Sequence, residues 1–307
     1  MGGNLTNGLT PAEGQGGTAP TTGLLAKVRL TLEMIKFEHS VFALPFALTG
    51  ALLAVRGLPT WRQLLWLVVA MVGARSAAMT FNRIVDLRLD ALNPRTQARA
   101  LPAGRLSLPF AAGFTMVACA VLVLAAYELN PLAFKLSPVA IVVLLGYSFT
   151  KRFTVLSHLI LGLCLGMSPP AAWIALRGNL SVSVLLLGAA VTLWVAGFDI
   201  IYACQDVEFD HALGLHSIPR RYGIRAALYT SAAAHLVTLA LLIVVACAEN
   251  LGWLAWAGLG AVGVLLAYEH ALVKPSDLSR VNAAFFTVNG FLSLLFFVTW
   301  GADVLIH

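Results

Sequence analysis

NRIVDLRLD at residues 82–90 and DIIYACQDVEFD at residues 199–210 together hold six of the 14 acidic residues of this chain. Polar side chains recur every four residues in both stretches, at Asn82, Asp86 and Asp90 and again at Tyr202, Asp206 and Asp210. Because positions i, i+4 and i+8 lie along one face of a helix, each stretch predicts a polar stripe on a helix. Asp206 follows Asp86 by 120 residues, and Asp210 follows Asp90 by the same interval. This equal spacing predicts a repeated group of helices that turns both stripes toward one central cavity.

The rest of the chain is strongly apolar. Of its 307 residues 59% are hydrophobic and 11% are charged, against ~25% charged residues in soluble domains, and the mean hydropathy is +0.85. A soluble core cannot hide so much apolar surface, whereas a bilayer can, and a spanning helix needs roughly 20 apolar residues. The sequence therefore predicts an all-α fold, a multi-pass transmembrane bundle of about nine helices around a central cavity. We expect the spans at residues 33–55, 62–82, 107–127, 134–149, 154–176, 181–203, 226–248, 253–273 and 283–304.

The N-terminal residues differ from the rest of the chain. Residues 1–23 are rich in Gly, Thr, Pro and Asn and lack apolar periodicity, which predicts a disordered cytoplasmic tail. The connections between the expected spans are brief and leave little room for a second soluble domain. Residues 24–307 are therefore expected to form one transmembrane domain.

Basic residues are distributed unevenly. Fifteen of the 20 Lys and Arg residues precede or open the first expected span or lie in alternate connections, whereas the other connections hold Arg56, Arg62, Lys135 and Arg177. Positively charged loops tend to stay on the cytoplasmic side of a membrane. We therefore expect an inner (cytoplasmic) membrane protein with its N-terminus in the cytoplasm and its C-terminus outside. The net charge of +6 then needs no nucleic-acid partner.

The carboxylates of the two stretches indicate a binding site. Ionised side chains near a membrane helix end are costly and usually functional, and carboxylates that converge on one cavity repel each other unless a cation lies between them. Hard oxygen ligands suit Mg²⁺, which takes a few carboxylates together with substrate phosphates. One Asp-x-x-x-Asp at a helix end is often only a cap or an ion-pair cluster, but two equivalent copies favour a site. Basic side chains on the same face suit a diphosphate: Arg83, Arg95, Arg99, Lys151, Arg152, Arg220 and Arg221.

At these residues the sequence resembles the UbiA family of intramembrane aromatic prenyltransferases. Residues 82–90 and 199–210 resemble the two aspartate motifs of the family, and residues 35–39, 93–99 and 150–154 resemble its other recurrent segments. The likeness covers nearly the whole chain from about residue 27 and is nearest to the 4-hydroxybenzoate polyprenyltransferase type. It implies Mg²⁺-dependent transfer of a prenyl group from a prenyl diphosphate to an aromatic acceptor, in ubiquinone or menaquinone biosynthesis. It identifies neither the prenyl chain length nor the acceptor.

The resemblance also implies roles for individual residues. It assigns Asn82, Asp86, Asp206 and Asp210 to Mg²⁺ and the diphosphate, with Asp90 in support, and places Asp199 and Tyr202 near the acceptor and the reacting carbon. We expect the substrate-binding residues to be Asn82, Arg83, Arg95, Arg99, Lys151, Arg152 and Lys36. A carboxylate on the acceptor needs a cation, and the sequence leaves Lys36 and Lys151 as alternatives.

Two other functions compete with prenyl transfer. A CDP-alcohol phosphotransferase also uses spaced aspartates in a membrane, but its motif needs an Asp-Gly pair, and the chain contains none. A secondary transporter also buries carboxylates, but its sites usually lie near the midplane of the bilayer. The carboxylates here cluster toward one membrane face beside many arginines, which favours the enzyme.

Three further patterns predict helix packing. Gly162 and Gly166 form a small-x-x-x-small pair that permits close approach of two helices. Pro169 and Pro170 should kink the fifth span. Asn282 and Asn289 are seven residues apart and are expected to share one face of the last span, where they either hydrogen-bond to neighbouring helices or line the cavity.

Overall fold

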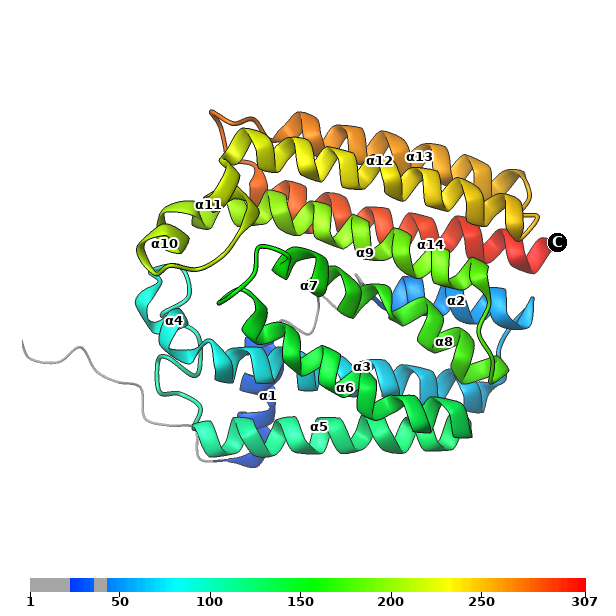
Figure 1. The fold of residues 1–307 in the computed structure, drawn as a ribbon. Coiled ribbons are helices and arrows are strands. Elements are labelled where there is room, and N and C mark those ends of the chain that lie inside the picture. Colours follow the sequence, from blue (N-terminus) through cyan, green and yellow to red (C-terminus); the bar gives the residue numbers. More distant parts are fainter. Residues whose placement is uncertain (1–22, 36–42) are drawn as a thin grey trace, which may run out of the picture.

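The computed structural model describes residues 23–35 and 43–307, which fold into a bundle of helices (Figure 1). Residues 1–22 of the expected tail and Lys36 lie outside the described residues. The described residues contain no strand beyond an isolated bridge between Lys274 and Asp277, so the all-α prediction is confirmed. The helices are α1 (Leu24–Met34), α2 (Leu44–Val55), α3 (Trp61–Val85), α4 (Leu87–Leu92), α5 (Leu108–Leu129), α6 (Pro131–Thr150), α7 (Ser157–Gly166), α8 (Ser168–Arg177), α9 (Val182–Ala203), the 3₁₀ turn η2 (Cys204–Asp206), α10 (Val207–Ala212), α11 (Ile218–Tyr222), α12 (Ile224–Ala248), α13 (Trp253–Leu272), the π-helix η3 (Ala283–Val288) and α14 (Asn289–Ile306).

Eight helical segments of the described chain are long and apolar enough to cross a membrane, and they correspond to the second to ninth expected spans. They are Trp61–Val85, Leu108–Leu129, Pro131–Thr150, Ser157–Arg177, Val182–Ala212, Ile224–Ala248, Trp253–Leu272 and Ala283–Ile306. Large apolar side chains lie exposed on these segments, among them Met116, Val142 and Leu236. Since a bilayer covers such surface and water does not, the protein is an integral membrane protein.

The first expected span, residues 33–55, is not one continuous helix. Helix α1 ends at Met34, and α2 begins at Leu44 with Pro45 in its first turn. Proline fixes φ near its helical value and lacks the N–H that a first-turn residue cannot use, so it favours a helix start at this point. Leu30 and Met34 of α1 pack instead against a small apolar cluster built by residues 100–111.

Helix α9 lies at the centre of the bundle. Two thirds of its apolar window is buried, against 17–39% for the other seven spanning segments. It packs against α12 on one side and α7 on the other (Figure 1). Helix α2 is also enclosed, with nine of its twelve residues buried. The second aspartate stretch therefore begins in the last turns of the most buried spanning helix.

The connections after α3, α6, α9 and α13 lie at one end of the bundle, which we call the carboxylate end (left in Figure 1). The connections after α2, α5, α8 and α12 lie at the opposite end. Two basic side chains at this opposite end are paired with acidic ones: Arg56 Nη2 lies 2.5 Å from Glu249 Oε2, and Arg62 Nη2 lies 2.8 Å from Glu128 Oε2. Both aspartate stretches thus end on the same side of the bundle, as predicted.

Small residues bring α7 against α9. A Cβ at Gly162 would overlap the carbonyl oxygen of Thr192, and one at Gly166 would overlap the carbonyl oxygen of Gly188. The predicted close packing at Gly162 and Gly166 is therefore confirmed. The predicted kink is also present, because α7 ends at Gly166 and α8 starts at Ser168 with proline in its first turn.

The prediction that Asn282 and Asn289 share a face is wrong. Asn282 is exposed, whereas Asn289 is fully buried. The π-helix Ala283–Val288 separates them, and its wider turn changes which residues lie above one another. Asn289 hydrogen-bonds to neighbouring helices: it accepts from Trp194 Nε1 at 2.8 Å and donates to Glu269 Oε1 at 3.0 Å.

Candidate functional site

Each aspartate stretch begins in a long helix, includes a break in the helix and ends in a short second helix. Asp86 (φ −89°, ψ 8°) separates α3 from α4, and Asp206 (φ −104°, ψ 9°) ends the turn between α9 and α10. Both backbones occupy the sparsely populated bridge region. The short helix that follows carries a buried aspartate as its fourth residue, Asp90 in α4 and Asp210 in α10. The two stripes are thus structurally equivalent, although each follows a broken helix and not a straight one.

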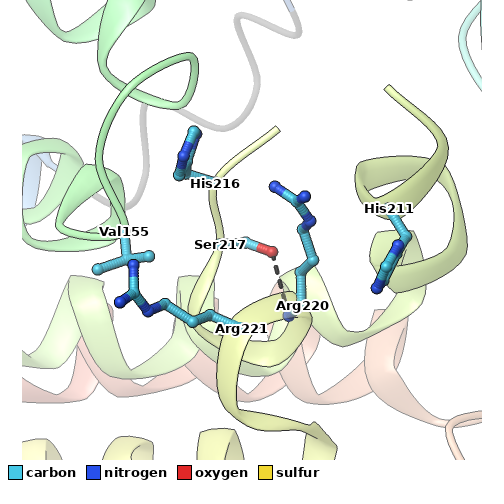
Figure 2. A pocket seen from close by; sticks show the side chains of 6 residues that line it. All are labelled: Val155, His211, His216, Ser217, Arg220 and Arg221. Carbon is cyan, nitrogen blue, oxygen red and sulfur yellow. Dashed lines mark hydrogen bonds between the residues drawn. The ribbon is translucent and has the colours of Figure 1, made fainter. Parts of the chain in front are cut away.

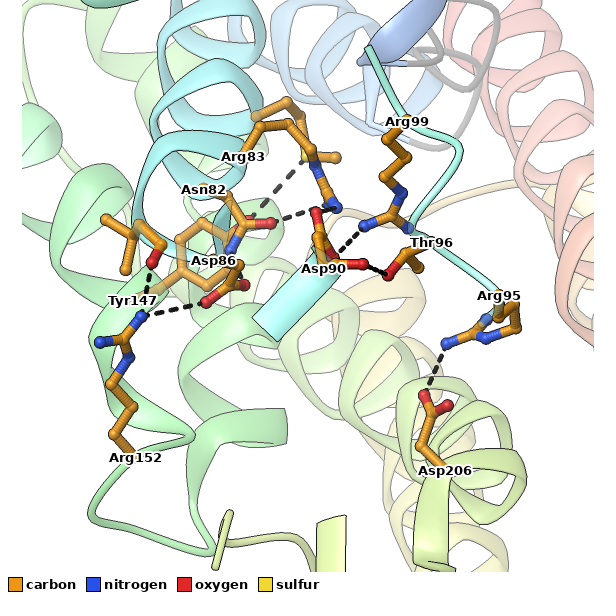
Figure 3. A network of polar contacts seen from close by, with 12 residues as sticks. Asn82, Arg83, Asp86, Asp90, Arg95, Thr96, Arg99, Tyr147, Arg152 and Asp206 are labelled. Carbon is orange, nitrogen blue, oxygen red and sulfur yellow. Dashed lines mark hydrogen bonds and ion pairs between the residues drawn. The ribbon is translucent and has the colours of Figure 1, made fainter. Parts of the chain in front are cut away.

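Asparagine and arginine side chains hold the first motif together (Figure 3). Asn82 Nδ2 donates to Asp86 Oδ2 at 3.1 Å, and Arg83 Nη2 donates to Asn82 Oδ1 at 2.8 Å. Arg83 Nη1 also reaches Asp90 Oδ2 at 3.1 Å. The stripe is therefore a connected polar network, and Arg83 links its first residue to its last.

Two more arginines reach the first motif from later in the chain. Arg99 Nη1 donates to Asp90 Oδ1 at 2.7 Å, so that both oxygens of Asp90 face a guanidinium. Arg152 Nη2 lies 3.5 Å from Asp86 Oδ1 and donates to the carbonyl oxygen of Val85 at 2.6 Å. Asp86 is the less tightly held of these two carboxylates, since its contact with Arg152 is longer than a hydrogen bond.

The second motif is held by side chains that come from the first half of the protein. Arg95 Nη2 donates to Asp206 Oδ2 at 2.6 Å, and its Nη1 donates to Tyr202 Oη at 2.5 Å. Lys151 Nζ lies 2.8 Å from Asp210 Oδ1. Asp210 is fully buried, and neither of its oxygens accepts a well-aligned hydrogen bond from the described residues. Burying a carboxylate without hydrogen-bond donors costs free energy. Asp210 is therefore a position where a further cation or donor would bind.

Arg95 and Lys151 occupy the region where the central cavity is expected. Arg95 follows α4 in the chain and crosses to the carboxylate of Asp206 (Figure 3), and Lys151 follows α6 and crosses to α10. Two basic side chains from the first half of the chain therefore hold the carboxylates of the second motif. An anionic ligand that enters between the motifs would offer these side chains new partners.

Burial and nearby positive charges shift the pKa values of Asp86 and Asp90 in opposite directions. Burial raises the pKa of Asp86 above its usual value, and the charges of Arg83 and Arg152 oppose that rise. Burial likewise raises the pKa of Asp90, and Arg83 is again the main opposing charge. Ionisation of both groups therefore depends on nearby cations.

The donor set fits a hard divalent cation. The motif side chains offer carboxylate and amide oxygens, as Mg²⁺ prefers, and Oδ2 of the buried Asp210 has neither an ion pair nor a hydrogen bond described, whereas Oδ1 is paired with Lys151. In residues 23–35 and 43–307 no three His, Cys, Asp or Glu side chains are close enough to share one ion. Mg²⁺ usually keeps several waters and uses one or two carboxylates with substrate phosphates. The residues present therefore fit Mg²⁺ that arrives with a phosphate ligand.

Asp199 and Tyr202 of the second motif lie deeper along α9 than Asp206 and Asp210. Asp199 Oδ2 is 2.7 Å from Nδ1 of His158 on α7. The ring of Tyr202 packs against Phe285 of the π-helix with 4.2 Å between centroids, and the guanidinium of Arg95 lies 5.1 Å from the same ring. The ring of Tyr202 thus contacts both an aromatic ring and a cation.

Two cavities lie at opposite ends of the bundle. One, of about 260 Å³, opens at the carboxylate end and is lined by Val155, His211, His216, Ser217, Arg220 and Arg221 (Figure 2). Arg220 and Arg221 thus line this cavity, and no ion pair is described between either of them and a motif carboxylate. The other, of about 540 Å³, is mostly apolar and is lined by Leu48, Leu52, Leu58, Pro59, Trp61, Leu64, Phe297, Val298, Gly301, Ala302 and Leu305. It lies at the opposite end of α3 from Asn82.

Comparison with known proteins identifies the family. The model of the UbiA prenyltransferase family matches residues 43–295, which is most of the chain. The chain belongs to the UbiA prenyltransferase family. A curated relative, 4-hydroxybenzoate octaprenyltransferase of Vibrio atlanticus, is 31% identical over 79% of this chain and 85% of its own length. The solved apo structure of a UbiA homolog from Aeropyrum pernix K1 is 36% identical, with a TM-score of 0.80 over 87% of this chain and 98% of that one.

A more distant UbiA homolog, from Archaeoglobus fulgidus and solved with DMAPP and Mg²⁺, is 18% identical. It has a TM-score of 0.69 over 89% of this chain and 98% of its own, so it shares the fold. This UbiA chain thus keeps the helix arrangement of both solved relatives.

Sequence reasoning missed His158 in this UbiA family member. It lies 41 positions before Asp199, and no regular spacing connects the two. A histidine within an apolar span is itself a signal, because ionisable side chains at membrane depth are rare and usually functional. Lys36, one of the two candidates for an acceptor carboxylate, lies outside the described residues, whereas Lys151 contacts Asp210.

Proposed function

We propose that this enzyme transfers a polyprenyl group from a prenyl diphosphate to the ring of a phenolic acid such as 4-hydroxybenzoate, in quinone biosynthesis. The observation that carries the proposal is the pair of equivalent aspartate motifs at one end of the bundle, whose carboxylates are paired with Arg95, Lys151 and Arg152. The curated relative named 4-hydroxybenzoate octaprenyltransferase supports this choice of acceptor class.

The diphosphate would bind between the two motifs with Mg²⁺. Asn82, Asp86, Asp206 and Asp210 would hold the ion, and Asp90, fixed by Arg83 and Arg99, would support the first motif. When bound, Mg²⁺ would act as a Lewis acid that neutralises the diphosphate and favours its departure. The solved relative with DMAPP and Mg²⁺ supports this assignment.

Three basic side chains would bind the diphosphate oxygens directly. Arg95, Lys151 and Arg152 each contact a motif carboxylate and are 37–43% exposed. Since a phosphate oxygen is as good a partner for a guanidinium or ammonium as a carboxylate is, these side chains can exchange one anion for the other at little cost. The carboxylates that they release would become free to bind the metal.

The acceptor would bind deeper, next to Asp199 and Tyr202. The bond between C1 of the prenyl group and the diphosphate oxygen breaks, and its electron pair leaves with the diphosphate. The ring carbon ortho to the phenol supplies the electron pair for the new C–C bond and then loses its proton. Asp199 would orient the phenol or accept a proton, and the face of the Tyr202 ring would stabilise the allylic cation. Either Lys151 or Lys36 would pair with the acceptor carboxylate.

A membrane assay tests this proposal. Membranes containing the protein are incubated with a set of prenyl diphosphates and several phenolic acids, and the products are identified by mass spectrometry. We expect a prenylated phenolic acid and diphosphate, both formed with added Mg²⁺ and neither formed with excess EDTA. Asp86→Asn should reduce turnover by roughly 10²-fold or more, because loss of a ligand carboxylate weakens the metal and the diphosphate together.

Glu208→Gln is the matched control. Glu208 is an acidic residue of the second motif, but it is exposed and lies off the polar stripe. Its replacement should leave turnover within about twofold. A wild-type protein that forms no prenylated product with any donor and acceptor pair, or an Asp86→Asn variant that works normally at limiting Mg²⁺, would refute the proposed function.

A further inference from the structure

His158 occupies a buried position between the proposed acceptor site and the carboxylate end. It is the second residue of α7 and is 4% exposed. Its Nδ1 lies 2.7 Å from Asp199 Oδ2, and its Nε2 lies 3.4 Å from the backbone nitrogen of Ile218. The close packing of Gly162 and Gly166 against α9 fixes the distance between the two helices that carry His158 and Asp199. The imidazole is thus restrained on both sides.

The two hydrogen bonds determine which ring nitrogen carries the proton. A backbone N–H can only donate, so His158 Nε2 must accept from Ile218 and carries no hydrogen. A neutral imidazole then has its hydrogen on Nδ1, which donates to Asp199 Oδ2. Oδ2 of Asp199 is then the acceptor of this bond. The imidazole therefore fixes the orientation of the Asp199 carboxyl group.

The same contacts connect Asp199 with the metal-binding end. Ile218 begins α11, and the segment before it is held by Leu215 N, which donates to Asp210 O at 2.9 Å, and by His216 N, which donates to Lys151 O at 2.7 Å. His158 thus joins the deep carboxylate to a backbone segment that contacts both Asp210 and Lys151. If diphosphate binding moved that segment, the His158 side chain would transmit the movement to Asp199.

We propose that His158 is a positioning residue that orients Asp199 toward the aromatic acceptor. The inference rests on the proposed function, because it takes Asp199 as the carboxylate that faces the acceptor. The bond from His158 occupies Oδ2, and Oδ1 accepts no hydrogen bond from the residues that the structure describes. Oδ1 is therefore the oxygen that meets the phenol. His158 itself touches neither substrate nor metal.

Steady-state kinetics with both substrates test this role, with wild type and Asp199→Asn as references. His158→Leu removes the Nδ1 donor and should lower kcat by about 10- to 100-fold, the scale for misplacing an acid–base group, while the affinity for a non-hydrolysable prenyl diphosphate analogue changes less than about twofold. His158→Asn places an amide nitrogen near the position of Nδ1. It should recover at least about a third of the wild-type kcat, because an amide N–H can replace the imidazole donor.

The double variant His158→Leu/Asp199→Asn separates positioning from general stability. If His158 acts through Asp199, the double variant should be no slower than Asp199→Asn alone, since coupled residues are not additive. The inference is overturned if the kcat losses of the two single variants multiply in the double variant. It is also overturned if His158→Leu turns over as fast as wild type. If His158→Leu does not fold, a His158→Asn variant as slow as Asp199→Asn overturns it equally. Failure of the wild type to form product would instead overturn the proposed function.

Discussion

At the scale of the residue, Arg95 links the loop that follows the first motif to the second motif. Its guanidinium donates to Asp206 Oδ2 at 2.6 Å and to Tyr202 Oη at 2.5 Å, from a loop that follows the first motif. The planar fork of arginine can hold two acceptors in a fixed geometry, which the single ammonium of lysine cannot do. One residue therefore sets the position of a proposed metal ligand and of an aromatic ring at the proposed reaction centre.

Replacing Arg95 should weaken use of the prenyl diphosphate more than use of the acceptor. We expect Arg95→Lys to lower kcat/KM for the prenyl diphosphate by about 10- to 100-fold, since a charge-assisted hydrogen bond contributes about 1.5–3 kcal/mol. Initial rates at varied prenyl diphosphate measure the effect. Arg88→Lys is the control, because Arg88 lies nearby in the first motif but is exposed. Equal losses in the two variants would contradict a specific role for Arg95.

At the scale of the element, the breaks within the motifs and the π-helix give the site its shape. The breaks at Asp86 and Asp206 start a short helix after each long one, which buries Asp90 and Asp210. The π-helix brings Phe285 against Tyr202, and Asn289 caps this segment by donating to the carbonyl oxygens of Ala284 at 3.0 Å and Phe285 at 3.3 Å. Departures from regular helix thus coincide with the candidate site.

Asn289 should contribute to stability because it satisfies several buried groups at once. Asn289→Leu removes the acceptor of Trp194 Nε1 and the donor of Glu269 Oε1, both of which are buried. We expect a loss of about 1–3 kcal/mol, the usual cost of an unsatisfied buried group, although interhelical hydrogen bonds in membranes often contribute only about 0.6 kcal/mol each. Thermal unfolding in detergent measures the change.

Asn282→Leu is the control for Asn289→Leu. Asn282 lies just before the same π-helix but is exposed, so its replacement should change the free energy of unfolding by less than about 0.5 kcal/mol. A larger effect at Asn282 than at Asn289 would show that the buried network is not what stabilises this segment.

At the scale of the whole molecule, charge is separated along the bundle axis. The proposed ligand-binding arginines and lysines lie at the carboxylate end, whereas at the opposite end Arg56 is paired with Glu249 and Arg62 with Glu128. On the basis of the positive-inside rule, we propose that the carboxylate end faces the cytoplasm. Prenyl diphosphate and acceptor would then both reach the site from the cytoplasmic side.

Cysteine labelling tests this orientation. In a variant that lacks Cys119, Cys164, Cys204 and Cys247, single cysteines replace exposed residues. Ser107→Cys and Ser276→Cys lie at the carboxylate end, and Leu180→Cys, at a residue that is 49% exposed, lies at the opposite end. A membrane-impermeant maleimide added to intact cells should label only the Leu180→Cys protein. Labelling at Ser276→Cys from outside would reverse the proposed topology.

The sequence by itself determined the all-α membrane fold, eight of the spans and the two aspartate motifs. These features follow from local patterns: long apolar runs, a four-residue period and an interval of 120 residues between equivalent aspartates. Such patterns can be read from the sequence because a bilayer requires continuous apolar helices and because ligand oxygens must share a helix face. Arg83, Arg95, Arg99, Lys151 and Arg152 were also identified as basic neighbours of the motifs from their place in the chain.

Only the tertiary structure decided which of these side chains meet. Nothing in the spacing connects Arg95 with Tyr202, Lys151 with Asp210 or His158 with Asp199, since each pair joins helices that are distant in the sequence. The break between α1 and α2 and the π-helix were likewise invisible to a regular helical period. Periodicity tells which face of a helix is polar, but helix packing decides what that face contacts.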